Sequence, residues 1–187
     1  MKRSSGMILP VFSLPSPHGI GTLGQAAYDF IDFLRDAGQS WWQMLPLGPT
    51  GYGDSPYQSL SAYAGNPYFI DLELLAQEGL LTREEIAAQP WGAEPNRVDY
   101  SALYAHRLAL LQKAARRGLI RGNQAVDAFL QENRHWLPDY ALYMAVKEHF
   151  GHLPWTQWPE EGIRLRRPEA LAHYRQLLAE EIETHQY

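Results

Sequence analysis

The sequence contains no cysteine, which excludes a disulfide framework and any metal site built from thiolates. It has no apolar run near the roughly 20 residues that a membrane-spanning helix needs, and the basic start, interrupted by Pro10, is too short for a secretory signal. A formal net charge of −5 argues against a nucleic-acid partner, because such a surface needs clustered positive charge. We therefore expect a cytoplasmic protein with neither a membrane nor a nucleic-acid partner.

Charge is nearly absent from one long segment in the first half of the chain. Between Ala37 and Ile70 the only formally charged side chain is Asp54, and no Lys or Arg occurs between Arg35 and Arg83. The same segment is rich in aromatic residues, namely Trp41, Trp42, Tyr52, Tyr57, Tyr63, Tyr68 and Phe69. A loop with so little charge to solvate it calls for a functional explanation.

The first 50 residues predict a strand, a helix and a second strand. Apolar runs at residues 6–16 and 40–47 are typical of buried strands. Thr22 and Gln25 have the spacing of a capping box at the start of a helix, and Gly38 suits its left-handed end. A βαβ unit of this kind places its two strands parallel to each other.

Beyond residue 70 the pattern becomes helical. We expect helices at residues 72–77, 83–88, 101–117, 123–134 and 139–150, and a last helix from Pro168 that carries Leu171, Tyr174, Leu178 and Ile182 on one face. The last helix reaches Tyr187 without a stop signal, which predicts a truncated end. The predicted fold is α/β, with a βαβ portion at residues 1–75 and a mostly helical subdomain at 76–187.

Two loops follow the carboxyl ends of the predicted strands, at residues 15–21 and 48–67. Loops at these ends carry ligands in parallel βα proteins, and long ordered loops are usually functional. Sugar rings have apolar faces and hydroxyl edges, so Tyr52 and Tyr57 are suited to the faces. The edges suit Asp54, Ser55, Gln58 and Ser59. Composition leaves open an inert loop, whose tyrosines pack on a neighbouring helix while Asp54 holds a turn.

Residues suited to catalysis are few. Glycoside chemistry uses two carboxylates that flank one bond, and the loop offers Asp54 alone. We interpret Asp71 and Glu73 as a helix cap or surface carboxylates. The seven histidines show no metal-binding pairing, and the sequence has no Gly-x-Ser-x-Gly elbow. We expect neither a metal nor a cofactor.

Three stretches together resemble the N-terminal part of amylomaltase, the 4-alpha-glucanotransferase or disproportionating enzyme of glycoside hydrolase family 77. They are "LPVFSLPSPHGIGTLG", "WWQMLPLGPTGYGDSPYQSLSAYAGNPYFIDL" and "DYALYMAVKEHFGHLPW". The resemblance implies the first two strands of a (β/α)8 TIM barrel with helical insertions. It implies transfer of alpha-1,4-glucan segments between maltooligosaccharides through a covalent ester on an Asp. In that family the catalytic carboxylates come from later strands, so we assign none here and expect the chain alone to be inactive.

The resemblance also implies binding residues. Ser55 and Tyr57 match positions that line the donor subsites, where the tyrosine stacks on a sugar ring, and Asp54 joins them as a substrate-binding residue. Tyr52 and Tyr100 match aromatic positions of a second, remote glucan groove. The alternative is a free-standing alpha-glucan-binding module without catalysis.

An unfinished barrel also has consequences for association. Two parallel strands leave unpaired backbone groups at both edges. We expect Trp41, Met44, Leu45 and the apolar side of the 171–182 helix to lack the barrel elements that would cover them. Self-association of the chain is the predicted result.

Overall fold

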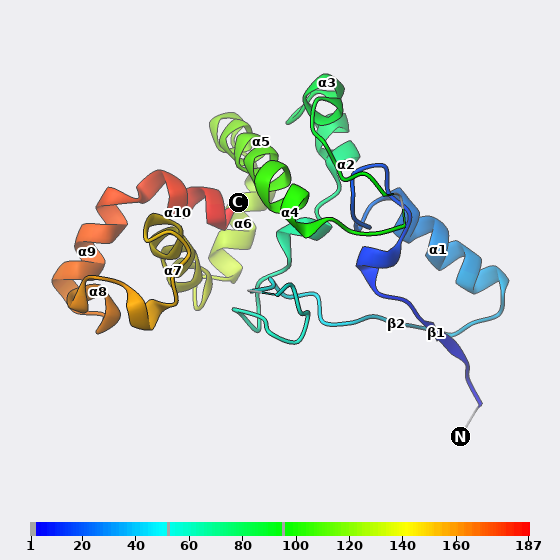
Figure 1. Ribbon diagram of the computed structural model, residues 1–187, viewed down its shortest axis with the longest axis horizontal. Helices are drawn as coiled ribbons and strands as arrows, with labels where there is room; N and C mark the ends of the chain where they lie inside the picture. The colour runs from blue at the N-terminus through cyan, green and yellow to red at the C-terminus, as the bar shows by residue number, and fades with distance from the viewer. Residues whose placement is uncertain (1–2, 52, 95) are drawn as a thin grey trace. The chain divides into compact units, whose positions relative to one another are not determined.

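The computed structural model describes residues 3–51, 53–94 and 96–187 (Figure 1). The chain divides into two compact units, Met1–Ala114 and Ala115–Tyr187, which we call the N-terminal and C-terminal units. We predicted a different division, at residue 75, between a barrel portion and a helical insertion. That division refers to the expected role of each part in a barrel, and it stays a prediction. Across the described ranges, no helix is long and apolar enough to cross a membrane.

The N-terminal unit begins with the predicted βαβ arrangement. Strands β1 (Gly6–Ile8) and β2 (Trp41–Gln43) pair in parallel, and helix α1 (Gln25–Asp36) connects them. Each strand has only three residues, shorter than the apolar runs predict. Pro10 accounts for the early end of β1, because it has no N–H for the ladder and a 3₁₀ turn, η1 (Val11–Ser13), follows it.

The start of α1 corrects the sequence prediction. The N-cap is Gly24, so the capping box of Thr22 and Gln25 does not form. The Thr22 hydroxyl instead donates a hydrogen bond to Asp71 Oδ2, at 2.5 Å. A side chain at Gly24 would collide with the same carboxylate, which explains why glycine stands there. The predicted left-handed end at Gly38 is confirmed, with φ at +69°.

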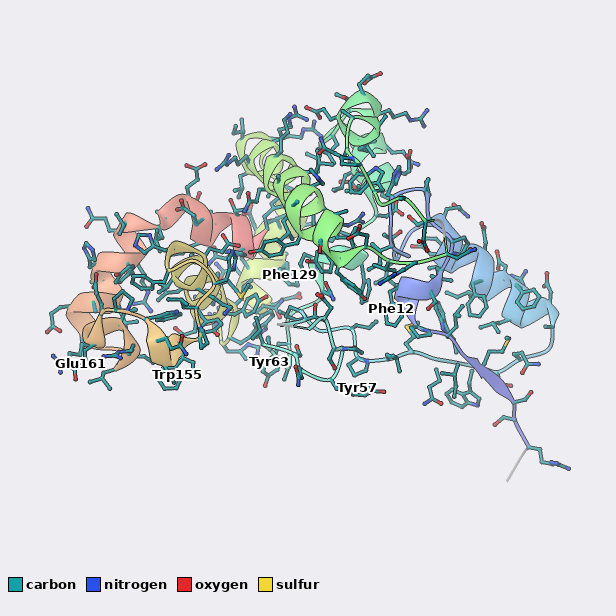
Figure 2. All side chains as sticks on the ribbon, viewed as in Figure 1. Phe12, Tyr57, Tyr63, Phe129, Trp155 and Glu161 are labelled. Atoms are coloured by element: carbon teal, nitrogen blue, oxygen red, sulfur yellow. The ribbon has the colours of Figure 1, made fainter. Side chains whose placement is uncertain are left out.

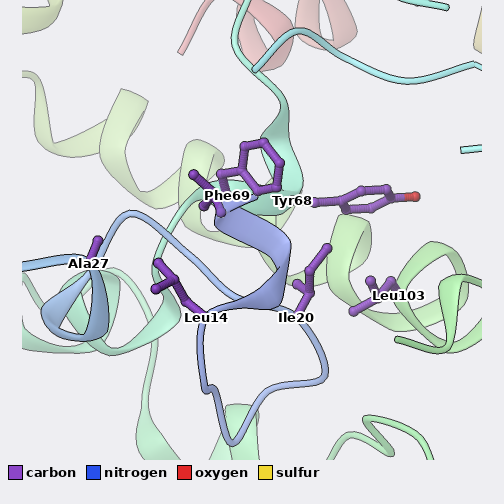
Figure 3. Packing of buried hydrophobic residues seen from close by; sticks show 7 residues of the cluster. Leu14, Ile20, Ala27, Tyr68, Phe69 and Leu103 are labelled. Carbon is purple, nitrogen blue, oxygen red and sulfur yellow. The ribbon is translucent and has the colours of Figure 1, made fainter. Parts of the chain in front are cut away.

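Beyond the loop at residues 48–67, the rest of the N-terminal unit consists of a series of mostly short helices. They are η2 (Pro67–Phe69), α2 (Leu72–Gln77), α3 (Arg83–Ala87), α4 (Tyr100–Ala102), the π-helical turn η3 (Leu103–Arg107) and α5 (Leu108–Arg121), which runs past the boundary of the unit. The main core joins the segment after β1 to η2 and η3. Leu14 and Ile20 pack there with Tyr68, Phe69 and Leu103 (Figure 3).

The C-terminal unit is entirely helical across its described elements. These are α6 (Gln124–Glu132), α7 (Leu137–His149), η4 (Trp155–Gln157), α8 (Glu161–Arg164), α9 (Pro168–Leu177) and α10 (Ala179–Gln186). The single last helix that we predicted is two helices, because Leu178 leaves the helical region with φ −112° and ψ 33°.

The apolar side of residues 171–182 is covered, contrary to our expectation. Tyr174 and Leu178 are buried in one cluster with Leu142 and Val146 of α7, inside the same unit. This side therefore needs no further barrel element. In the N-terminal unit, Trp41 is 66% exposed, as expected of an uncovered strand. Met44 is half-buried and packs against the main core.

Candidate functional site

The charge-poor loop at residues 48–67 is ordered by its own backbone. An antiparallel bridge joins Thr50 to Ser59, and the Leu60 N–H donates to Pro49 O at 3.3 Å. The Asn66 N–H donates to Leu47 O at 2.8 Å, which closes the ends of the loop. A loop fixed in this way can present side chains in a defined geometry.

Tyr57 is the most exposed aromatic side chain among the described residues of the loop. It is 73% exposed, and Figure 2 shows its side chain extending away from the ribbon of the loop. Ser55 beside it is half-buried, and its Oγ accepts a hydrogen bond from the Tyr57 N–H at 3.4 Å. The inert-loop interpretation required packed tyrosines, and Tyr57 does not fit that requirement. Its ring face is available to a flat partner.

Asp54 lies on the inner side of the loop, in the left-handed region with φ at +52°. Its half-buried carboxylate accepts a hydrogen bond from Thr50 and lines a small hollow of about 10 Å³ together with Tyr68 and Tyr100. That volume is about the room one water molecule needs. Burial raises the pKa of Asp54, and the hydrogen bond from Thr50 opposes this effect.

The two tyrosines of the hollow stay protonated at neutral pH. Burial, reinforced by the negative charge of Asp54, raises the pKa of Tyr68 to about 12. The pKa of Tyr100 is raised by burial and then by Asp54. Both phenols are therefore hydrogen-bond donors beside a carboxylate. The structure thus brings Tyr100 and Asp54, which we had assigned to different glucan sites, to one hollow. Tyr52 lies outside the described residues.

Tyr68 is a member of this hollow that sequence reasoning did not select. It is 7% exposed, and its N–H donates to Asn66 Oδ1 at 3.0 Å. The local signal was the Asn66-Pro67 pair, which caps the short helix η2 and turns Tyr68 inward. Nothing local indicated that the ring would meet Asp54.

The two carboxylates after the loop have structural roles. Asp71 is the N-cap of α2, since its Oδ1 accepts from the Leu74 N–H at 3.0 Å, which confirms the helix-cap interpretation. Glu73 Oε1 lies 3.0 Å from His18 Nε2, and its Oε2 lies 3.7 Å from Arg83 Nε. In the described part of the chain, no three His, Cys, Asp or Glu residues form a group that would hold a metal ion.

The candidate site lies in a βα unit with a parallel strand pair, on a loop that follows the second strand. Comparison with known proteins gives the family. A sequence model described as 4-alpha-glucanotransferase matches residues 9–187. The chain therefore belongs to the 4-alpha-glucanotransferase family.

Individual relatives agree with this assignment. The 4-alpha-glucanotransferases of Streptococcus pneumoniae and Thermus thermophilus are both 46% identical to the chain, over 98% and 100% of its length respectively. The chain spans 37% of the length of each. A solved structure, an amylomaltase from Streptococcus agalactiae in complex with acarbose, superposes with a TM-score of 0.95 at 44% identity, over 99% of this chain and 38% of that one.

Proposed function

We propose that this chain is the glucan-binding N-terminal portion of a 4-alpha-glucanotransferase. The full-length enzyme transfers alpha-1,4-glucan segments between maltooligosaccharides through a covalent glycosyl-enzyme intermediate. Residues 1–75 supply the first two strands of a (β/α)8 barrel, and residues 76–187 supply a helical insertion. Family membership and the parallel pairing of β1 with β2 support this proposal. The enzyme works in the cytoplasm without a cofactor.

The observation that carries the proposal is the exposed Tyr57 ring on an ordered, charge-poor loop. An aromatic face buries the apolar face of a sugar ring, while neighbouring polar groups bind its hydroxyls. The Ser55 hydroxyl accepts the Tyr57 N–H and keeps its own proton for donation. The Asp54 carboxylate is half-buried, and its accessible side would accept from a sugar hydroxyl while the rest of the group faces Thr50 and the hollow. The related amylomaltase was solved with acarbose, and we extend this class of ligand to the present chain.

The second, remote glucan groove remains part of the proposal through Tyr52 and Tyr100. The position of Tyr100 at the Asp54 hollow adds a structural reason for its importance, because a change there would also disturb the loop. A groove built around Tyr100 would therefore be coupled to the Ser55–Tyr57 site.

The chain binds and orients glucan, whereas the chemical step belongs to the full-length enzyme. Transfer requires a nucleophilic carboxylate and a separate acid/base carboxylate on either side of the scissile bond. In the chain, Asp71 caps a helix and Glu73 faces His18, so neither is free for this work. We expect no release of glucose from maltotriose by the purified chain. Turnover that disappears when a carboxylate of the chain is mutated would contradict this.

Titration calorimetry with maltoheptaose separates this proposal from the alternative, a free-standing glucan-binding module. A portion of a larger barrel should bind maltoheptaose weakly on its own and at least tenfold more tightly in the full-length enzyme. A module should bind equally well in both forms. Equal affinities would therefore favour the module. We further propose that the isolated chain self-associates through the uncovered face of β1 and β2.

A further inference from the structure

Arg107 is the most deeply buried charged side chain among the described residues. It ends the π-helical turn η3 and has no exposed surface. Arginine is rarely found fully buried, because removing a guanidinium from water costs several kcal/mol. Burial lowers the pKa of Arg107 to about 10, and the negative charge of Asp71 opposes this, so the group stays charged at neutral pH. A cost of this size calls for a specific role.

The guanidinium of Arg107 joins two loops that lie far apart in the sequence. Its Nη2 donates to Ile70 O at 2.6 Å, and its Nη1 donates to His18 O at 3.3 Å. The ring of Trp91 lies beside it, with its centroid 6.0 Å from Cζ. His18 belongs to the loop after β1, and Ile70 ends the long segment after β2. Both loops leave the carboxyl ends of the parallel strands, where βα proteins bind ligands.

Two further hydrogen bonds join the same loops. The Leu23 N–H donates to Phe69 O at 2.9 Å, and the Thr22 hydroxyl donates to Asp71. The acceptors at Phe69, Ile70 and Asp71 are consecutive residues, so the ties converge on one short stretch. This stretch directly follows the loop that carries Tyr57, and Tyr68 of the Asp54 hollow is its neighbour.

Only arginine suits this position. Two carbonyls on different loops need two donors held at a fixed separation, and the planar guanidinium provides them. A lysine ammonium is a point charge, and it would serve one carbonyl well at the expense of the other. The π-helical turn is consistent with a special role, because such turns are frequent at functional sites.

We propose that Arg107 is a positioning residue for glucan recognition, which holds the loop after β1 and the loop after β2 in their binding geometry without touching the glucan. This inference rests on the proposed function of the Tyr57 loop. Loss of Arg107 removes the donors of the His18 and Ile70 carbonyls. The stretch 69–71 then loses one of its ties to the loop after β1, and the Asp54 hollow beside this stretch and the base of the Tyr57 loop become less firmly held.

The first measurement is amide hydrogen exchange on the purified chain, with Arg107→Met and Arg107→Lys. Arg97→Met is the matched control, because Arg97 is an exposed arginine of the same unit. We expect Arg107→Met to speed exchange at the Leu23 amide at least tenfold, with little change in the middle of α1. Arg107→Lys should give a smaller increase, and the control none. A uniform increase through the unit, or no increase, would overturn the inference. If Arg107→Met does not fold, Arg107→Lys alone carries the same comparison.

The second measurement is maltoheptaose binding to the full-length enzyme. Arg107→Met should raise the dissociation constant at least fivefold, and Arg107→Lys should restore part of the loss. Tyr57→Ala is measured in parallel. If Tyr57→Ala weakens binding and Arg107→Met does not, the positioning role is wrong while the proposed function stands. If neither variant weakens binding, the proposed function of the loop itself fails.

Discussion

The charge-poor loop of the N-terminal unit and the aromatic cluster of the C-terminal unit treat their aromatic residues in opposite ways. In the C-terminal unit, Trp158 is 4% exposed and lies against the rings of Tyr143 and Phe150, with centroids 5.7 and 5.8 Å away. In the charge-poor loop of the N-terminal unit, Tyr57 and Tyr63 are 73% and 68% exposed. Similar side chains thus build a core in the cluster and a surface in the loop.

The surrounding charge accounts for this difference. The C-terminal unit surrounds its aromatic cluster with exposed ion pairs, such as Arg166 with Asp139 and Arg116 with Glu180, which keep its surface hydrated. The loop has only Asp54, and that carboxylate faces inward to Thr50 and the hollow. A surface of aromatic faces without charge suits a neutral ligand with apolar faces. The comparison teaches that exposure, more than aromatic content, separates binding residues from packing residues.

The largest expected effect concerns the buried aromatic cluster of the C-terminal unit. Trp158→Ala should lower the free energy of unfolding of the C-terminal unit by about 3–5 kcal/mol, because it removes a buried ring and the hydrogen bond from its Nε1 to Leu153 O. Tyr57→Ala should change the stability of the N-terminal unit by less than about 0.5 kcal/mol. Urea unfolding followed by circular dichroism measures both. Similar losses for the two variants would contradict the comparison.

The next effect concerns a second exposed apolar surface, on the strand pair. Its expected partner is another copy of this chain. Ile8 and Trp41 lie on one face of the strand pair and are 67% and 66% exposed, while Trp42 on the other face packs against Phe30. We expect the isolated chain to self-associate at micromolar concentration. Ile8→Ser should weaken association at least tenfold, since burying such a side chain contributes about 1.5–3 kcal/mol.

Sedimentation equilibrium measures this association, and Phe33→Ser is its control. Phe33 is an exposed apolar residue of α1, 56% exposed, that lies outside the strand pair. Its substitution should leave association unchanged. A monomeric chain that also fails to bind an apolar dye would show that the strand face needs no cover.

Local patterns predicted much of the fold. The parallel βαβ unit, the helix at 72–77 and the stop at Gly38 follow from apolar periodicity and glycine chemistry within a few residues. Two predictions about helix ends were wrong, at Thr22 and at Leu178, because local patterns did not show the cause. Thr22 does not cap α1, because Asp71, far along the chain, takes its hydroxyl. The break at Leu178 also lacks any glycine or proline signal.

In the candidate site, too, local sequence indicated some residues and gave no sign of others that the tertiary fold brings together. The composition of the loop singled out Tyr57 but left open whether its ring is packed or exposed, and the structure shows it exposed. Tyr68 and Tyr100 come to Asp54 only through the tertiary fold, and no spacing in the sequence encodes that meeting. The role of Arg107 was missed for the same reason, because its two acceptors lie 89 and 37 residues away.

A smaller effect concerns the exposed ring of Tyr57 and is measured in the full-length enzyme. Tyr57→Ala should weaken maltoheptaose binding more than Tyr57→Phe, by about 0.5–1.5 kcal/mol if the ring face stacks on a sugar. Calorimetric titration of both variants measures the difference. Equal losses would assign the effect to the hydroxyl, and no loss in either variant would return the loop to the inert interpretation.

The smallest expected effect concerns Asp54, the one charge of the loop. Burial raises the folded-state pKa of its carboxylate, so the stability that this group contributes is present below the unfolded pKa of about 3.8 and is lost as the pH rises through the folded pKa. At pH 7 the ionised carboxylate therefore destabilises the fold. Asn tolerates the left-handed φ of +52° and retains an acceptor for Thr50. Because the carboxylate is only half-buried, solvent screens much of this effect, and Asp54→Asn should raise the free energy of unfolding at pH 7 by no more than about 0.5 kcal/mol.

The pH dependence and a control make this prediction specific. The gain should shrink as the pH falls through the folded pKa and vanish below 3.8, where Asp54 becomes protonated in both states. Asp127→Asn should instead cost a little stability at pH 7, because Asp127 is an exposed carboxylate in the first turn of α6. In the full-length enzyme Asp54→Asn should also weaken glucan binding, since a neutral amide accepts hydrogen bonds less strongly than a carboxylate. A variant that gains stability and loses affinity would identify Asp54 as a residue kept for binding. Unchanged affinity would leave it a turn residue.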